Sequence, residues 1–307
     1  MKFRLLIFCF CFLLATKANC QEKTPISGDT QQILFLGNSI TYAGQYIAFI
    51  ETYYRLKHPE STIEWINLGL PSETVSGLSE EGHAGGAFPR PDLHERIDRI
   101  FEQILPDLVF ANYGMNDGIY LPLDDSRFQK YKDGIEWLAS EIASINAQSI
   151  FLAPPIYDPI KGEAYANVLD NYSDWLISKR YTDDWEVIDL HWPMRKYLED
   201  QRKTDSEFFL AKDGIHPGEL GHWLMARPIL EYLGLEAEEF GTFQSAISEF
   251  ENGEKIFNLI SKKQAILRDA WLRSTGHLRP GLAEGLPLDE AYIQVDLLEK
   301  EIRDLLH

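Results

Sequence analysis

Cysteine is scarce in this chain of 307 residues, and its positions are informative. All three cysteines, Cys9, Cys11 and Cys20, lie within the first 20 residues. A chain that loses this segment has no thiol, which excludes a disulfide framework and a cysteine-ligated metal site. About 287 residues then remain, enough for one large α/β domain with an appendage.

Long hydrophobic runs are also lacking. The longest apolar stretch, residues 5–15, follows two basic residues and ends at small residues. It is too short to span a bilayer, which takes about 20 residues, and it predicts a secretory signal peptide over residues 1–20. We therefore expect a secreted or periplasmic protein without a transmembrane helix. Cys20 stands where a lipoprotein carries its lipid, but Lys17 makes a poor lipobox, so simple cleavage is favoured over lipid anchoring.

Basic residues are few: 29 Lys and Arg stand against 48 Asp and Glu, giving a formal net charge of −19. This balance excludes a nucleic-acid partner, whose phosphates require lysine and arginine, and it disfavours anionic membrane surfaces. No Asp-x-Asp-x-Asp-Gly loop is present, so the acidic excess indicates solubility and not calcium binding. The histidines form no His-x-x-x-His or His-Glu-x-x-His pattern, so no zinc site is expected.

Short apolar runs alternate with segments of helical periodicity, a pattern that predicts βαβ units and a parallel sheet. The runs lie at residues 33–37, 62–68, 108–113, 149–153 and 186–190. The first and third are apolar without alternation, as in central strands that helices cover on both faces. We predict a three-layer α/β/α domain over residues 30–235 with a parallel sheet of about five strands.

The strand pattern stops after Gly234, and only helical periodicity follows. Two helical stretches, joined by a Gly- and Pro-rich link at 276–287, carry apolar stripes that burial explains most simply. We therefore predict a helical C-terminal extension over 236–307 that packs on the domain and supplies no catalytic group. His277 and Arg279 in the link are placed to approach the rim of the site and to tune substrate choice.

Polar residues follow the first and third predicted strands, at the sheet edge where parallel α/β proteins bind ligands. Ser39 comes on the turn into a helix, where its side chain is exposed and its N–H can help bind an oxyanion. Capping of that helix is the alternative role for this serine. Asn116 offers an amide N–H donor to a developing negative charge, although Asn-Asp-Gly is also ordinary turn chemistry.

A late turn, Asp213-Gly-Ile-His216-Pro, places a carboxylate three residues before a histidine. This spacing allows Asp213 to accept from imidazole Nδ1 while Nε2 faces the site, as in the base and orienting acid of a hydrolase triad. A solvated loop histidine and a metal ligand are the alternatives.

Taken together, these motifs resemble the SGNH hydrolases, the GDSL esterase/lipase superfamily. Residues 37–41 (Gly-Asn-Ser-Ile-Thr), 114–117 (Gly-Met-Asn-Asp) and 213–217 resemble the first, third and fifth blocks of that family, in order. The resemblance covers roughly residues 32–233, a span typical of one domain, and leaves out the helical tail. It implies a flavodoxin-like fold and a serine esterase that needs no cofactor or metal.

The resemblance also implies roles for single residues. Ser39 is the expected nucleophile, and His216 and Asp213 are its base and orienting acid, in a mechanism with an acyl-enzyme intermediate. The expected oxyanion hole consists of the N–H groups of Ser39 and Ser72 and the side chain of Asn116.

Two positions depart from the family pattern. Asn38 replaces the usual Asp after Gly, which keeps a hydrogen-bonding side chain. In the second block, residues 67–74, Ser72 stands where a glycine is usual. A backbone N–H suffices there if the backbone angles of Ser72 are acceptable, and Gly69 is the alternative donor.

The glycine-rich segment 72–92 follows the second strand beside Ser39, as loops that line sites do. Candidate substrate contacts are Glu73, His83, Arg90, Asp117 and Trp192. The absence of a long apolar flap and the acidic charge favour short acyl groups, particularly acetyl groups on carbohydrate. A lysophospholipase or thioesterase of the same fold is the enzymatic alternative. A non-catalytic binding protein is disfavoured because Ser39, Asn116, Asp213 and His216 are retained together.

Overall fold

Five strands form one parallel sheet in the computed structural model, which describes residue 26 and residues 29–307. The expected signal peptide and Cys20 lie outside this part. The strand order β2-β1-β3-β4-β5 is that of flavodoxin-like folds, so the predicted fold class is confirmed. The strands are β1 (Gln32–Gly37), β2 (Glu64–Asn67), β3 (Leu108–Asn112), β4 (Gln148–Leu152) and β5 (Glu186–Ile188).

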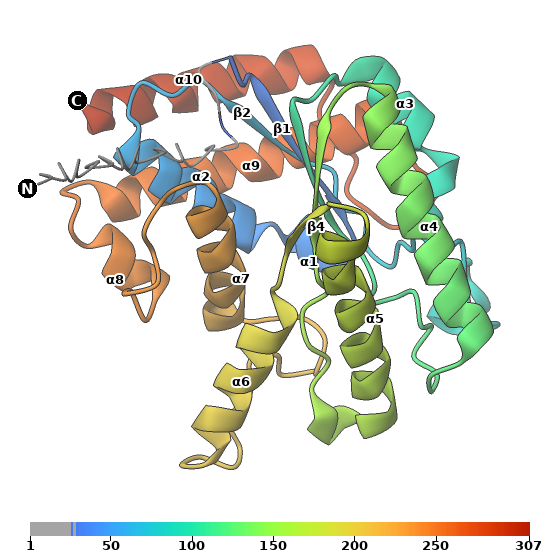
Figure 1. Ribbon diagram of the computed structural model, residues 1–307. Helices are drawn as coiled ribbons and strands as arrows, with labels where there is room; N and C mark the ends of the chain where they lie inside the picture. The colour runs from blue at the N-terminus through green and yellow to red at the C-terminus, as the bar shows by residue number, and fades with distance from the viewer. Residues whose placement is uncertain (1–25, 27–28) are drawn as a thin grey trace, which may run out of the picture.

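Helices cover both faces of the sheet (Figure 1). On one side lie α2 (Gln45–Lys57), α7 (Glu219–Tyr232) and α9 (Gly253–Thr275). On the other lie α3 (Ile97–Gln103), α4 (Asp125–Ser144) and α5 (Glu163–Thr182). The remaining helices of the described residues are α1 (Ser39–Ala43), α6 (His191–Arg202), α8 (Phe243–Ile247) and α10 (Leu288–Leu306). The same part of the chain contains the short 3₁₀ turns η1 (His83–Gly86), η2 (Leu93–Glu95) and η3 (Pro159–Lys161).

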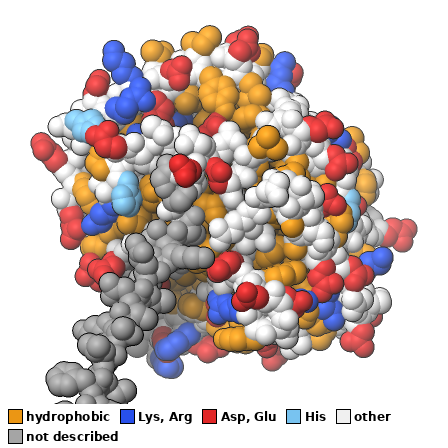
Figure 2. All heavy atoms as spheres, turned by 45° about the horizontal axis from the view of Figure 1, so that its top comes forward, with side chains coloured by type: hydrophobic (Ala, Val, Ile, Leu, Met, Phe, Trp, Pro, Cys, Tyr) orange, Lys and Arg blue, Asp and Glu red, His pale blue; other side chains and the backbone are white. Residues whose placement is uncertain are grey.

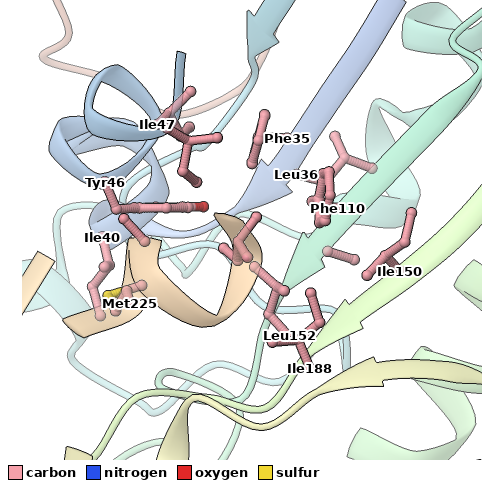
Figure 3. Close-up of a cluster of buried hydrophobic side chains, with 14 of the residues drawn as sticks. Phe35, Leu36, Ile40, Tyr46, Ile47, Phe110, Ile150, Leu152, Ile188 and Met225 are labelled. Atoms are coloured by element: carbon pink, nitrogen blue, oxygen red, sulfur yellow. The ribbon is translucent and has the colours of Figure 1, made fainter. Parts of the chain in front are cut away.

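The core lies between the sheet and these helices. Residues 33–36 of β1 are fully buried, as the unbroken apolar run predicts for a central strand. Phe35 stacks on Phe110 of the neighbouring strand β3 with ring centroids 5.0 Å apart. Tyr46 from α2 and Met225 from α7 close the same cluster (Figure 3). The carboxyl ends of β1 and β3 are thereby held side by side.

Helix α6 follows β5 and carries Pro193 as its third residue. Proline is tolerated at this point, because the first N–H groups of a helix have no intrahelical acceptor.

The C-terminal helices pack on the β2 side of the domain. Helix α9 contacts α2 and β2, and the Gln264 side chain donates to the main-chain carbonyl of Trp65 on the edge strand at 3.0 Å. Buried Lys263 pairs with Glu51 of α2 and with Glu299 of α10. Because each buried charge has a partner, this contact ties the extension to the domain without leaving an uncompensated ion.

Acidic side chains are spread over the face shown in Figure 2, among basic and apolar ones. Within the described residues, 26 and 29–307, no helix combines the length and the apolar character needed to cross a bilayer.

Helix α4 approaches the segment after β2 unusually closely, and Gly134 makes the approach possible. A Cβ at this position would lie 2.2 Å from the carbonyl oxygen of Val75. The α4 backbone therefore rests directly on the segment that follows the turn containing Ser72.

We expect Gly134→Ala to destabilise the protein. Alanine gains about 1 kcal/mol of helix propensity, but the overlap with Val75 costs about 1–3 kcal/mol or more, since this backbone must shift. Ser140→Ala, on the exposed face of the same helix, is the matched control and should be neutral or slightly stabilising. Urea denaturation measures both variants. A Gly134→Ala protein at least as stable as Ser140→Ala would contradict the close packing.

Candidate active site

Ser39, His216 and Asp213 form one hydrogen-bonded chain. Ser39 Oγ lies 2.8 Å from His216 Nε2, and His216 Nδ1 lies 2.7 Å from Asp213 Oδ2. The side chains of His216 and Asp213 are 51% and 53% exposed. Chemically, this arrangement can take a proton from the serine hydroxyl at a site open to solvent.

The side chain of Ser39 does not cap the helix that follows it. Asn38 is the N-cap of α1, and its Oδ1 accepts from the N–H of Ile40 at 3.0 Å. This contact satisfies the helix end and leaves Ser39 Oγ for His216. It also accounts for Asn38, since the amide oxygen supplies the acceptor that the usual aspartate would supply.

Asp213 is held as a carboxylate. Burial tends to raise its pKa, but hydrogen bonds from the His216 side chain and from the N–H groups of His216 and Ile215 outweigh that effect and lower the pKa to about 2. The two N–H groups lie 2.8 and 2.9 Å from Asp213 Oδ1. Asp213 therefore stays negative at neutral pH and fixes which ring nitrogen of His216 carries the proton.

An ion pair behind the late turn supports it. Asp158 accepts from Arg202 at 2.9 and 2.7 Å, and its own N–H donates to the carbonyl of Gly214 at 3.0 Å. Sequence reasoning missed both Asp158 and Arg202. Since they are 44 residues apart, no local pattern signals the pair.

Ser72 and Gly69 are distinguished by their backbones. The N–H of Gly69 donates to Asn67 Oδ1 at 2.9 Å and is buried, so it is not available to a substrate. Gly69 instead allows the chain to pass against α1, because a Cβ there would lie 2.2 Å from the Tyr42 nitrogen. Ser72 adopts φ 69°, the left-handed region that glycine favours. Its N–H has no acceptor within the described residues.

Asn116 is buried and oriented by two contacts. Its Nδ2 donates to the main-chain carbonyl of Glu73 at 3.1 Å, and its Oδ1 accepts from the Tyr120 hydroxyl at 3.1 Å. One Nδ2 hydrogen is left for another acceptor. Burial raises the pKa of Tyr120 to about 12, so the phenol keeps its proton at neutral pH. Tyr120 is a third residue that sequence reasoning missed.

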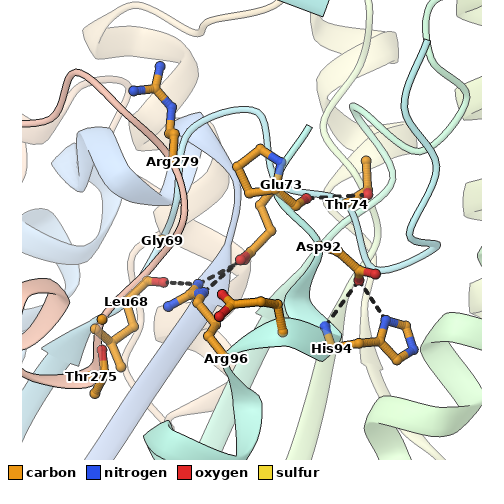
Figure 4. A network of polar contacts seen from close by, with 12 residues as sticks. Leu68, Gly69, Glu73, Thr74, Asp92, His94, Arg96, Thr275 and Arg279 are labelled. Carbon is orange, nitrogen blue, oxygen red and sulfur yellow. Dashed lines mark hydrogen bonds and ion pairs between the residues drawn. The ribbon is translucent and has the colours of Figure 1, made fainter. Parts of the chain in front are cut away.

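Two of the candidate substrate contacts are instead buried structural residues. Glu73 is fully buried and binds Arg96 through two hydrogen bonds of 2.6 and 2.8 Å (Figure 4). Arg96 also donates to the Leu68 carbonyl, and so fixes the start of the turn. Asp117 is fully buried and accepts from the N–H groups of Val75, Ser76 and Gly114. Neither carboxylate faces solvent, which corrects the expectation that they contact substrate.

His83 and Arg90 share a partner. Both bind Glu80, His83 at 3.1 Å and Arg90 through hydrogen bonds of 2.6 and 2.7 Å. The Arg90 guanidinium also lies over the Tyr120 ring, 5.2 Å from its centroid. These contacts bring the segment 72–92 against the residue that orients Asn116.

Trp192 lies in the first turn of α6 and is 37% exposed. Its indole N–H donates to Asp174 on α5 at 2.9 Å. Its contacts are thus with a neighbouring helix.

Within the described residues, no three His, Cys, Asp or Glu side chains gather in a group that could hold a metal ion.

Comparison with known proteins defines the class. Residues 35–224, well over half of the chain, match the model of the GDSL-like lipase/acylhydrolase family. The chain therefore belongs to this family and is a carboxylic ester hydrolase, as the sequence motifs predict. An acetylxylan esterase from Geobacillus stearothermophilus is 22% identical over 227 residues, which are 68% of this chain and 96% of that protein.

Solved structures share the fold. The acetylxylan esterase Axe2 of Geobacillus stearothermophilus superposes with a TM-score of 0.54 at 21% identity, over 69% of this chain and 97% of Axe2. LAE5, a hydrolase from the metagenome of Lake Arreo, Spain, gives 0.55 at 21% identity, over 70% of this chain and all of LAE5. BT4096, a gut microbial diltiazem-metabolizing enzyme, gives 0.57 at 21% identity, over 69% of this chain and 49% of its own length. The chain thus spans about half of BT4096.

Glu73→Gln should destabilise the fold and leave substrate affinity alone. The change leaves Arg96 as a buried charge without its partner, which costs about 3–5 kcal/mol of unfolding free energy. Glu81→Gln, at an exposed position of the same segment, should stay within about 0.5 kcal/mol. Denaturation curves and KM, measured where the variant is folded, check this. A large rise in KM with unchanged stability would restore Glu73 as a substrate contact.

Proposed function

We propose that this protein is a secreted serine esterase that removes short acyl groups, acetyl above all, from carbohydrate. The chain Ser39–His216–Asp213, with contacts of 2.8 and 2.7 Å, is the observation that carries the proposal. Export of the protein rests on the signal-peptide pattern of residues 1–20, outside the described part of the chain.

In the proposed mechanism, Ser39 Oγ attacks the ester carbonyl while His216 Nε2 takes its proton. The negative charge of Asp213 stabilises the imidazolium that forms. The carbonyl oxygen, now an oxyanion, accepts from the N–H groups of Ser39 and Ser72 and from Asn116 Nδ2. His216 then protonates the leaving alcohol, and water activated by the same imidazole releases the acyl group from Ser39.

Two observations support a short acyl group on a polar, bulky alcohol. The side chains of His216 and Asp213 are half exposed, so a large alcohol can reach them without a cover having to open. The similarity to a protein named acetylxylan esterase favours acetyl groups.

Asn116→Ala should lower kcat by roughly 10²–10³ while KM changes little, because the lost donor acts mainly in the transition state. Tyr120→Phe removes only the hydroxyl that orients Asn116 and should lower kcat by a smaller factor, about tenfold. Tyr157→Phe is the matched control, since its hydroxyl bonds to Lys161 and not to Asn116. Steady-state kinetics on one acetyl ester decide this. If the Asn116→Ala variant keeps the wild-type kcat, Asn116 is not part of the oxyanion hole.

A panel of esters tests the substrate class. We expect kcat/KM for acetyl esters to exceed that for butyryl esters by about tenfold or more, because extra methylenes must fit a site built for a small group. Acetylated xylo-oligosaccharide should be hydrolysed and a lysophospholipid should not. Ser39→Ala should lose at least about 10³-fold of the activity. Faster turnover of long-chain esters or lysophospholipid would replace the carbohydrate esterase proposal with a lipase-type function.

A further inference from the structure

The link between α9 and α10 reaches the turn that carries Ser72. Arg279 in this link donates from Nε to the main-chain carbonyl of Pro71 at 2.9 Å, across 208 residues of sequence. Figure 4 shows Arg279 on the C-terminal segment where it runs beside this turn. The carbonyl of Pro71 and the N–H of Ser72 belong to one planar peptide group. Arg279 therefore holds one end of the unit whose other end is the proposed oxyanion donor.

This peptide group needs such support. A non-glycine residue in the left-handed region is strained by about 1–2 kcal/mol, and Ser72 has φ 69°. Strained backbone persists only where its surroundings hold it. On the other side of Ser72, its carbonyl lies 3.5 Å from Arg90 Nη1. The peptide groups before and after Ser72 are thus each contacted by a guanidinium, and the Pro71 contact is the shorter one.

Arg279 is itself held in place. Its guanidinium lies over the Phe88 ring, 5.5 Å from the centroid, and Nη1 donates to the Pro280 carbonyl at 2.9 Å. The start of the link is fixed where Arg99 of α3 donates to the Thr275 carbonyl at 2.7 Å. Near its end, Arg273 of α9 donates to the Gly285 carbonyl at 2.7 Å. The link is therefore held near both ends and can fix the position of the Arg279 guanidinium.

We propose that Arg279 is a positioning residue for the oxyanion hole, so that the C-terminal extension takes part in catalysis through the Pro71–Ser72 peptide. A charged donor on the carbonyl fixes the direction of the N–H and polarises it toward its acceptor. The extension supplies no group that touches substrate. Through Arg279 it instead fixes the direction of the Ser72 N–H, which is the group that would contact the oxyanion. This inference rests on the proposed function, and it concerns a segment beyond the residues 35–224 that match the family.

Arg279→Ala, Arg279→Lys and Arg273→Ala, made in the full chain, test the proposal by steady-state kinetics on an acetyl ester. Arg279→Ala should lower kcat by about 10- to 100-fold, less than outright loss of a donor, with KM within about twofold. Arg279→Lys keeps a single charged donor and should stay within about fivefold of wild type. Millimolar guanidinium should restore part of kcat to Arg279→Ala. Arg273→Ala releases the far end of the link, at Gly285, without touching Pro71, so its kcat should fall much less than that of Arg279→Ala.

The outcomes separate the two proposals. If Arg279→Ala keeps wild-type kcat while Ser39→Ala is inactive, the positioning role is wrong and the serine esterase mechanism stands. The same holds if Arg273→Ala loses as much kcat as Arg279→Ala, because loosening of the link then explains the loss. If Ser39→Ala stays active, both proposals fail. Circular dichroism and thermal melting show that each variant is folded. If the alanine variant is not, Arg279→Met, which fills the space beside Phe88 but has no donor for Pro71, replaces it.

Discussion

The pairing of β1 with β3 is the constraint on which the site depends. These strands are far apart in the sequence but adjacent in the sheet, with Gly37 opposite Asn112. Each ends at the same edge, so the turns that follow bring Ser39 and Asn116 to neighbouring places. The buried aromatic pair Phe35 and Phe110 holds these strands together from within. The arrangement of the candidate catalytic motifs is thus a consequence of strand order.

Much of this could be predicted from the sequence. Unbroken apolar runs indicated the central strands, because only a strand covered on both faces can bury every side chain. The motif around Asp213 and His216 predicted a local geometry, since the four residues of one turn suffice to form it. Ser39 was ambiguous between a cap and a nucleophile. The structure excludes the capping role, because the Ile40 N–H donates to Asn38, and it places the Ser39 hydroxyl on His216.

What could not be predicted depends on partners remote in sequence. Glu73 looks like a loop acid beside a site, and only the approach of Arg96 and of the Tyr113 hydroxyl makes it a buried structural group. The roles of Asp158 and Arg202 likewise depend on their pairing across the fold. The role of Tyr120 depends on the direction of its hydroxyl, which donates to Asn116. Local patterns carry no information about such pairs, because burial and pairing arise only when separate elements pack.

The contact between Gln264 and the edge strand has a consequence for the order in which the protein matures. Strand β2 is made early in synthesis, but the helix whose Gln264 covers the Trp65 carbonyl follows about 200 residues later. Until then the nascent sheet presents an open edge, the feature through which unfinished chains join one another. The last quarter of the chain therefore covers the β2 edge of the sheet. Nascent chains that end before this segment leave the edge open and are the ones that can associate strand to strand.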